Sequence, residues 1–447
     1  MEPIIDLSTE GTLSELDLFS VPPTQTAITE HIVTEHRPLN PLGDVNTIEF
    51  KISTASDEYI NFAETLLFLK LRVSLIKTDN TALTADAWKS ISPVNYFMQS
   101  LFREVALKIG DKQVTMAPQT YPYKAYFEAL LGYTKDAKKS YLGSALWATN
   151  EESVDDSVDA TRNTVFTAAK GSKSFSVSNE INLMGRLHLD MALQPKLLLG
   201  GTELTLSFKP NSPEFCLMCS AEKLVPKIEI TEACLFVHRS KVAPHIVEGH
   251  LAGLQLATVK YPIVRSEVKA ITLPSGMSDI IIDNVVNGQL PRRLFIAFVD
   301  HSALTGSFKK NPFNLKHFKL NYLATFINGV QYPSKPFTPD YDKEQYVREY
   351  MSLFEATNQL NTMDSKVNIT YDSYGIGHTI YGFNLAQDSS DGCCGTSSHA
   401  NLIRRGQLRV ECHFAEQLAS PVNMLCYLEY DNLLEIDRDK SVRTNYM

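Results

Sequence analysis

Cys216 and Cys219 have the Cys-x-x-Cys spacing that can hold a metal ion or support thiol–disulfide exchange. A structural zinc site needs four ligands, and the sequence has no second cysteine pair at matching spacing. A redox pair lies at the start of a helix in a strand–helix–strand unit, which the surrounding pattern does not predict. The segment Phe215–Met218 is apolar. We therefore predict two buried structural thiols, and we place Cys393 and Cys394 in a polar loop with no shared site.

The eleven histidines are spread along the whole sequence. His31 and His36 are five positions apart, as are His245 and His250, whereas a zinc-binding helix carries its two histidines four positions apart. The spacing therefore predicts no metal site.

Other enzyme classes leave equally little trace. A two-domain cupin would gather histidines and a glutamate on barrel strands, but we expect His188 and His413 to stand alone on separate strands. The chain has no glycine-rich phosphate loop and no Gly-x-Ser-x-Gly motif. The acidic run at 151–159 lacks the ligand spacing of a calcium loop, so we expect a solvated face. A glycosidase pair of carboxylates would come from distant segments, so the sequence leaves that class open. We predict no catalytic, cofactor-binding or metal site.

Charge and composition limit the possible partners. The net charge is −9, and residues 1–30 contain six acidic residues but no lysine or arginine. Binding to phosphates requires cations, so this N-terminal segment is not expected to condense nucleic acid. No apolar run approaches the roughly 20 residues of a membrane span, and no signal peptide is recognisable. The odd count of seven cysteines indicates reduced thiols in the cytosol or nucleus.

Period-two alternation of apolar and other residues is the dominant pattern. The longest run is at 67–75, where every second residue is leucine or valine. Shorter runs occupy 48–52, 204–208 and 408–414. Each run predicts a strand with one buried face. Many short strands between turn signals favour a sandwich or a barrel.

Two segments, 342–356 and 123–131, carry apolar residues at helical spacing. Asp342 and Gln345 have the spacing of a capping box. We expect Gly132 to end the other helix in a left-handed conformation.

Three short similarities recur in the same order about 220 residues apart, which indicates that the second half copies the first. They are the two helices, the turns at 109–113 and 327–331, and the segments 185–190 and 406–411. Polar insertions at 150–180 and 386–401 follow the two helices, so we expect them in equivalent loops.

We therefore predict an extended acidic arm at 1–43 and two β-domains at 44–240 and 250–436. The two domains join near 243–251, and residues 437–447 form a C-terminal tail.

The arm contains the segment Ser14–Thr26, which reads SELDLFSVPPTQT. This segment resembles the opening of the capsid-like proteins of Polinton (Maverick) elements and the related adintoviruses. The resemblance continues loosely through 37–39, 48–50 and 66–73.

The resemblance implies an all-β fold of two tandem eight-stranded jelly rolls, a double jelly roll, with a few short helices in loop insertions. The implied fold is similar in architecture to that of virophage and adenovirus major capsid proteins. The implied function is that of a structural major capsid protein, not an enzyme. Trimers would form pseudo-hexagonal capsomers that tile an icosahedral shell around a DNA genome.

The implied partners are two further copies of the chain, neighbouring capsomers, a single jelly-roll penton protein and minor capsid proteins. No cofactor, no sequence-specific nucleic acid and no membrane span are expected. The protein would be part of the virion, made in the host cytoplasm, with the nucleus as an alternative place of assembly. We expect an assembly segment in the arm, formed by Leu16, Leu18, Phe19, Val21, Pro22 and Pro23. The alternatives are a minor capsid or spike protein of the same element, or a cytosolic β-sandwich carbohydrate-binding protein or hydrolase.

Overall fold

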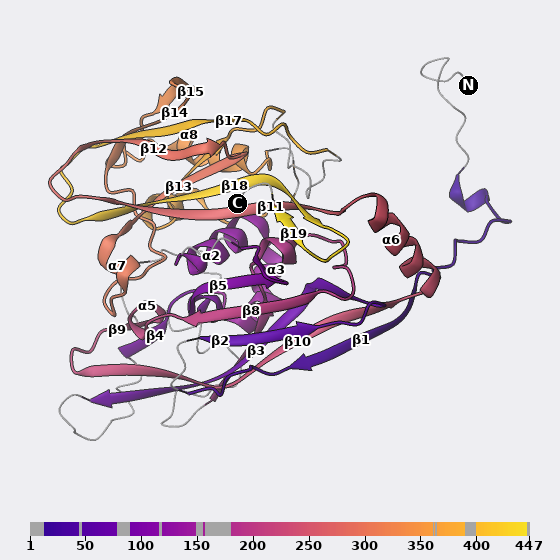
Figure 1. The fold of residues 1–447 in the computed structure, drawn as a ribbon. Helices are drawn as coiled ribbons and strands as arrows, with labels where there is room; N and C mark the ends of the chain where they lie inside the picture. Colours follow the sequence, from indigo (N-terminus) through magenta and orange to yellow (C-terminus); the bar gives the residue numbers. More distant parts are fainter. Residues whose placement is uncertain are drawn as a thin grey trace, which may run out of the picture.

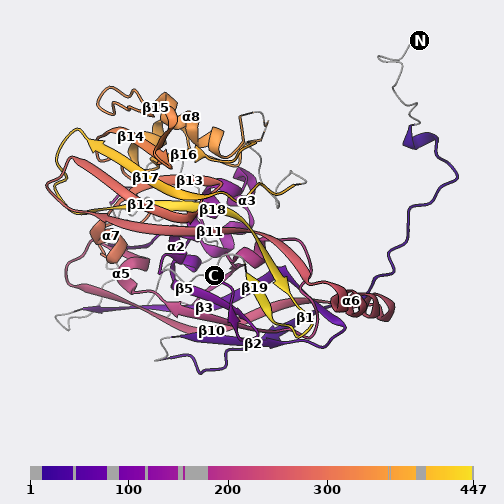
Figure 2. The same cartoon turned by 45° about the horizontal axis from the view of Figure 1, so that its top comes forward.

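The computed structural model describes residues 13–43, 47–77, 90–115, 119–148, 155–156, 180–360, 362, 364–388 and 399–444. Two β-sandwiches are stacked on each other, with helices between them (Figure 1). The first half of the chain builds one sandwich and the second half builds the other, as Figure 2 also shows.

The first sandwich consists of two four-stranded antiparallel sheets. One sheet has the order β1-β10-β3-β7 and the other has the order β2-β8-β5-β6. The bounds are β1 Ile28–His36, β2 Ile48–Ser53, β3 Glu58–Lys77, β5 Phe102–Ile109, β6 Lys112–Gln113, β7 Glu180–Arg186, β8 Glu203–Pro210 and β10 Leu224–Val242.

The second sandwich repeats this arrangement strand for strand. Its sheets have the orders β11-β18-β13-β16 and β12-β17-β14-β15, and β19 pairs with β18. The bounds are β11 Val259–Leu273, β12 Asp279–Gln289, β13 Arg293–Asp300, β14 Leu320–Ile327, β15 Val330–Phe337, β16 Ile380–Asn384, β17 Arg405–Phe414, β18 Val422–Ile436 and β19 Val442–Thr444.

In both sandwiches the chain visits the two sheets in the same sequence, so the first strand lies beside the eighth, and the second lies beside the seventh. This is the jelly-roll path. The predicted double jelly roll is confirmed, and we call the two sandwiches the first roll and the second roll.

Shorter elements complete the chain. They are η1 Ser14–Leu16, β4 Ile91–Pro93, α1 Phe97–Ser100, α2 Tyr121–Gly132, α3 Lys135–Lys139, η3 Tyr141–Ala145, η4 Asp190–Leu193, α5 Pro213–Cys216, β9 Leu217–Cys219, α6 Pro244–Leu256, α7 His301–Thr305, α8 Val347–Ala356 and α9 Tyr371–Ile376. The four runs of period-two alternation lie in β2, β3, β8 and β17, as predicted.

The two predicted helices are present as α2 and α8, but their predicted ends are wrong. The segment before α8 folds back in a β-bridge between Asp340 and Gln345, so the helix begins only at Val347 and no capping box forms with Asp342. Gly132 lies inside α2 and does not take a left-handed conformation.

The duplication is correct for two of the three predicted similarities. The turn at Gly110 joins β5 to β6 and the turn at Asn328-Gly329 joins β14 to β15, which are equivalent strand pairs. Gly110, Asn328 and Gly329 all have positive φ, as tight hairpins require. The third similarity is wrong, because 185–190 begins at the end of β7, the sixth strand of the first roll, whereas 406–411 lies in β17, the seventh strand of the second roll. Any strand with one buried face produces such an alternation of apolar and polar residues, so this similarity does not identify equivalent strands.

The predicted equivalence of the two insertions is wrong for a related reason. Residues 150–180 lead into β7, which begins at Glu180, whereas residues 386–401 follow β16, the strand equivalent to β7. The two insertions therefore belong to different connections of the roll.

The domain limits remain a prediction, but two segments differ from it. Ile28–His36, expected in the arm, is β1 and pairs with β10 at the edge of a sheet. Val442–Thr444, expected in the tail, is β19. The join contains the helix α6.

The equivalent sheets β1-β10-β3-β7 and β11-β18-β13-β16 differ in whether one or both of their faces are covered. In the second roll, β13 and β18 are buried on nearly every residue, because the inner face packs within the roll and the outer face packs on the first roll. In the first roll, β3 alternates between buried and more exposed residues. The sheet β1-β10-β3-β7 therefore has one bare face, to which we refer as the bare sheet face.

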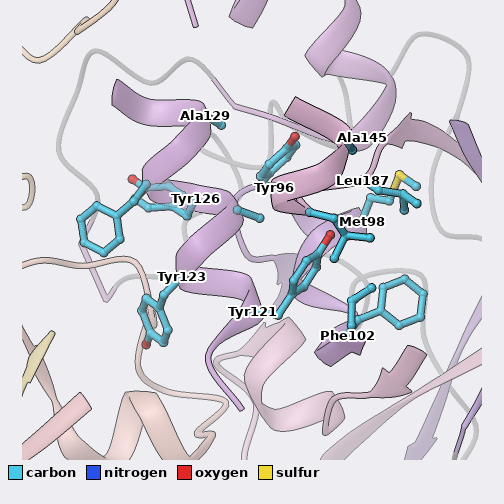
Figure 3. Close-up of a cluster of buried hydrophobic side chains, with 14 of the residues drawn as sticks. Tyr96, Met98, Phe102, Tyr121, Tyr123, Tyr126, Ala129, Ala145 and Leu187 are labelled. Carbon is cyan, nitrogen blue, oxygen red and sulfur yellow. The ribbon is translucent and has the colours of Figure 1, made fainter. Parts of the chain in front are cut away.

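The helix α2 fills the space between the rolls with aromatic side chains. Tyr121 points from α2 to the side where Tyr96 and Phe102 lie, whereas Tyr123 points away on the opposite side of the helix (Figure 3). The rings of Tyr123 and Tyr126 pack against the ring of Phe313. On another side of the helix, the ring of Phe127 stacks on that of Tyr427 in β18, with centroids 5.4 Å apart. Aromatic side chains of α2 therefore pack against both rolls.

Candidate assembly surface

The predicted assembly segment projects from the body of the protein (Figures 1 and 2). Its large apolar side chains face solvent, with 78% of Leu18, 98% of Phe19 and 86% of Val21 exposed. Contiguous exposed apolar side chains mark interaction sites on soluble proteins. Covering one such side chain stabilises a contact by about 1.5–3 kcal/mol.

A few local hydrogen bonds shape this segment. The backbone N–H of Ser20 donates to Oδ1 of Asp17 over 3.1 Å, and its hydroxyl donates to the other carboxylate oxygen. The Ser20 hydroxyl and N–H therefore lower the pKa of Asp17. Nearer the body, the Gln25 side chain bonds to both the N–H and the C=O of Ile28. The segment is thus anchored where β1 begins.

The arm and α6 leave the body at the same corner. The C=O of Ala27 accepts a 2.8 Å hydrogen bond from the N–H of Ala243, one residue before α6. Leu254 is buried against Tyr59 and Val242, so α6 is fixed to the first roll. Ile246 and Val247 are partly covered by the same cluster, whereas most other residues of α6 are exposed, with Leu256 90% exposed.

The helix α6 was not predicted, and its residues were expected only to join the two domains. Pro244 at the first turn is a helix-start signal, and Val247 and Leu254 have helical spacing. These two signals predict a short amphipathic helix.

The bare sheet face adds apolar residues away from the arm. Val225 and Ile76 are paired across β10 and β3 and are 42% and 53% exposed. Val33 on β1 is 49% exposed. Together, the arm, α6 and the bare sheet face form what we call the candidate assembly surface.

The cysteines are placed as structural thiols. Cys216 donates to the C=O of Ser100 over 3.2 Å, and Cys219 donates to the C=O of Ala221 over 3.5 Å. Both are free and buried, and burial raises the pKa of each thiol. Raised pKa values disfavour the reactive thiolate. Cys393 and Cys394 lie outside the described residues.

Buried carboxylates from distant segments do meet, as a glycosidase would require. Glu128 and Asp190 approach Lys124, whose Nζ lies 2.5 Å from Asp190 and 3.8 Å from Glu128. Glu128 also lies 2.7 Å from Nδ1 of His188. Ser266 of the second roll donates to Glu128 and Asp190. We call these five residues the polar seam.

The polar seam is arranged to hold charges, not to cleave a sugar. Burial alone would raise the pKa of Glu128, but Lys124 and the His188 hydrogen bond outweigh burial and hold it below its ordinary value. The adjoining cavity measures about 20 Å³, near the size that admits a single water molecule. A carbohydrate cannot enter it. His188 itself follows β7 and does not lie on a strand, contrary to the prediction.

Part of the predicted solvated acidic run is instead a structural contact. Asp156 accepts hydrogen bonds from Asn311 and Asn314 and lies 2.5 Å from Nζ of Lys316. These contacts lower the pKa of Asp156 against the opposing effect of burial. The rest of the run, apart from Asp155, lies outside the described residues.

Two histidines expected to be scattered come together. The pairing of β1 with β10 brings His31 and His238 within 3.2 Å of each other. Glu64 of β3 lies beside them. By contrast, His413 pairs with Asp279, and its ring packs against Tyr322.

Among the described residues, no helix combines the length and apolarity needed to cross a bilayer.

Known proteins resemble this chain along nearly its whole length. A curated, uncharacterised protein of Caenorhabditis elegans is 24% identical over 429 residues, which are 93% of this chain and 97% of the relative. No family model matches the chain.

Solved structures share its fold. A chain of the Sputnik virophage gives a TM-score of 0.63 at 13% identity, covering 100% of this chain and 92% of that one. The Faustovirus major capsid protein gives 0.59 at 9% identity over 94% and 92%. The mavirus major capsid protein gives 0.52 at 12% identity over 100% and 96%. These likenesses identify the fold as that of double jelly-roll capsid proteins.

Proposed function

We propose that this chain is a structural major capsid protein that forms the shell of a virus particle. The observation that carries the proposal is the double jelly roll, shared from end to end with a chain of the Sputnik virophage and with the major capsid proteins of Faustovirus and mavirus. A fold alone admits many functions. Two features of the chain add support. Its arm exposes apolar side chains, and the cavity beside the polar seam has no room for a substrate.

The proposed unit is a trimer. Three chains place six similar rolls around a threefold axis, which gives a nearly hexagonal tile. The contacts between subunits would be heterologous and would close into a ring. The candidate assembly surface offers apolar side chains for contacts within the trimer and between tiles. Such tiles would build an icosahedral shell around a DNA genome, together with a penton protein and minor capsid proteins.

The opening segment Ser14–Thr26 supports a finer proposal, that the chain comes from a Polinton-like element or an adintovirus. Its place would then be the virion, after synthesis in the host cytoplasm.

The first experiment measures the mass of the purified full chain by light scattering and images the same sample by negative stain. We expect a particle near three times the 50.0 kDa of one chain, with a hexagonal outline, or closed shells. A stable monomer across salt and pH would contradict the proposal and return attention to a carbohydrate-binding protein or hydrolase. In isolated particles, tens of copies instead of hundreds would identify a minor capsid or spike protein.

The arm is tested by removing residues 1–26, which spares β1. We expect the truncated chain to fold but to assemble less well, because the neighbouring copy loses the apolar contact of Leu18 and Phe19. The matched control is Thr24→Ala within the same arm, which should assemble normally. Unchanged trimer and shell yields after truncation would show that the arm has no role in assembly.

A further inference from the structure

Three strands of the bare sheet face bring two imidazoles and a carboxylate together. His31 lies on β1, His238 on β10 and Glu64 on β3, which are consecutive strands of the sheet. One ligand atom from each residue lies within 4.8 Å of the others. Neither the polar seam nor the predicted assembly segment contains any of these three residues.

The strand register explains how the two histidines meet. His238 is paired with Val33, and His31 is paired with Ser240, so the histidines are diagonal neighbours on antiparallel strands. Diagonal neighbours are within reach of long side chains. Nδ1 of His238 lies 3.2 Å from Nε2 of His31.

A bulge in β3 adds the carboxylate. The register passes from His238 opposite Asn61 to Phe236 opposite Leu66, so residues 62–65 of β3 face a single residue of β10. Phe62 and Thr65 turn inward and are buried, while the side chain of Glu64 is 58% exposed. Its Oε2 lies 3.4 Å from Nδ1 of His238. Bulges of this kind redirect a side chain and are frequent beside functional sites.

The distances match the coordination shell of a small divalent metal ion. Zinc–ligand bonds of 2.0–2.1 Å in a tetrahedron place neighbouring ligand atoms about 3.3–3.4 Å apart. Both measured contacts of His238, 3.2 Å and 3.4 Å, fall close to this edge. The third edge, between His31 and Glu64, can shorten because the Glu64 side chain is exposed and free to rotate.

We propose that His31, Glu64 and His238 bind a zinc ion on the bare sheet face. Imidazole nitrogens with a carboxylate suit zinc and other late first-row metals. Without a metal, a hydrogen on Nδ1 of His238 can be donated to Nε2 of His31 or to the Glu64 carboxylate, but not to both. When the metal takes the lone pair of Nδ1, His238 carries its hydrogen on Nε2 instead. Three protein ligands leave one tetrahedral position for water.

The metal would also fasten the strand that carries the arm. β1 is the edge of its sheet, and the arm extends from its first residue. A zinc ion held by β1, β10 and β3 links this edge strand to two inner strands. Anything that binds the folded state but not the unfolded chain stabilises the folded state.

The test is calorimetric titration of zinc chloride into the tag-free, chelator-treated full chain. We expect one zinc ion per chain, no such binding by His238→Ala, and at least tenfold weaker binding by Glu64→Gln. The control His413→Ala removes another histidine that faces a carboxylate but has no second imidazole in its pair, and it should bind zinc normally. Circular dichroism of each variant verifies that it is folded.

Cobalt provides an independent readout, since a tetrahedral Co²⁺ site has intense visible absorption bands that an octahedral site lacks. Hydrogen exchange should slow at the amides of β1 when zinc is added to the wild type, but not to His238→Ala. Binding of zinc by His238→Ala with the wild-type stoichiometry, or no binding by the wild type, would overturn the proposal. Neither outcome would bear on the capsid proposal, which rests on assembly.

Discussion

The equivalent sheets β1-β10-β3-β7 and β11-β18-β13-β16 follow the same strand order in two very different surroundings. The sheet of the second roll is covered on both faces, and β13 is therefore an almost unbroken apolar run, Leu294–Val299. The sheet of the first roll has a bare face, and its strands alternate. Sheets covered on both faces have continuous apolar strands, whereas half-covered sheets alternate. The strand pattern thus indicates which of the two equivalent sheets packs against the other roll and which has a face open to solvent.

The first prediction tests how much the polar seam stabilises the contact between the two rolls. Glu128→Ala leaves Lys124 buried with less compensation and removes the carboxylate that faces Nδ1 of His188. We expect the free energy of unfolding to fall by about 3–5 kcal/mol, the usual cost of breaking a buried ion pair. Urea denaturation measures the change, and both rolls should still unfold in a single transition.

Glu203→Ala is the control for this change, because Glu203 forms an exposed ion pair with Lys51 at 2.7 Å. Exposed pairs contribute less than about 1 kcal/mol. Equal losses in the two variants would mean that the seam does not hold the rolls together.

The second prediction compares one glycine in each of two equivalent strands. A methyl group at Gly382 of β16 would lie 2.7 Å from the Ala356 side chain and 2.8 Å from the Ser352 carbonyl oxygen in α8. At Gly185 of β7 it would meet the flexible end of Met98 at 3.0 Å. Gly382→Ala should cost about 1–3 kcal/mol by overpacking, and Gly185→Ala should cost less. Thermal unfolding of both variants checks the order, and the reverse order would contradict the close packing of α8.

The third prediction concerns a lysine at the contact between the rolls. Lys138 is buried and donates to the carbonyl groups of Leu130 in the first roll and Lys366 in the second roll. Burial lowers its pKa to about 7. Between pH 7 and the ordinary pKa of a lysine, the unfolded chain therefore binds more protons than the folded chain.

The stability of the wild type should consequently rise with pH in this window, relative to Lys138→Met, by up to about 1.4 kcal/mol per pH unit. Urea denaturation at pH 7.5, 8.5 and 9.5 measures the difference. Lys139→Met, at the exposed neighbouring position, is the control and should follow the wild type. A constant difference between wild type and Lys138→Met would rule out the lowered pKa.

The fourth prediction concerns the bare side of the comparison and has the smallest effect on stability. Phe19→Ser changes a side chain that is 98% exposed. The free energy of unfolding should change by less than about 0.5 kcal/mol. A larger loss would mean that the arm folds against its own subunit.

The sequence predicted local features well and long-range contacts poorly. Alternation located β3 and β17 because one buried face is a local property of a strand. Because alternation is common to all half-buried strands, it also produced the wrong third similarity, between 185–190 and 406–411. His31 and His238 are 207 residues apart, and only the pairing of β1 with β10 brings them together. The bulge that exposes Glu64 likewise has no signal in the chain, since it depends on the partner strand.

The adjacency of the first and last strands in each roll has an evolutionary consequence. Ile28 is paired with Val242 in the first roll, and Val259 is paired with Ile436 in the second. Each roll therefore receives and releases the chain at a single corner, and a short helix of 13 residues suffices to connect the two copies. A gene for one roll could be duplicated head to tail without any strand having to cross the existing sandwich. The compatible ends of a single roll make the double roll accessible in one genetic step.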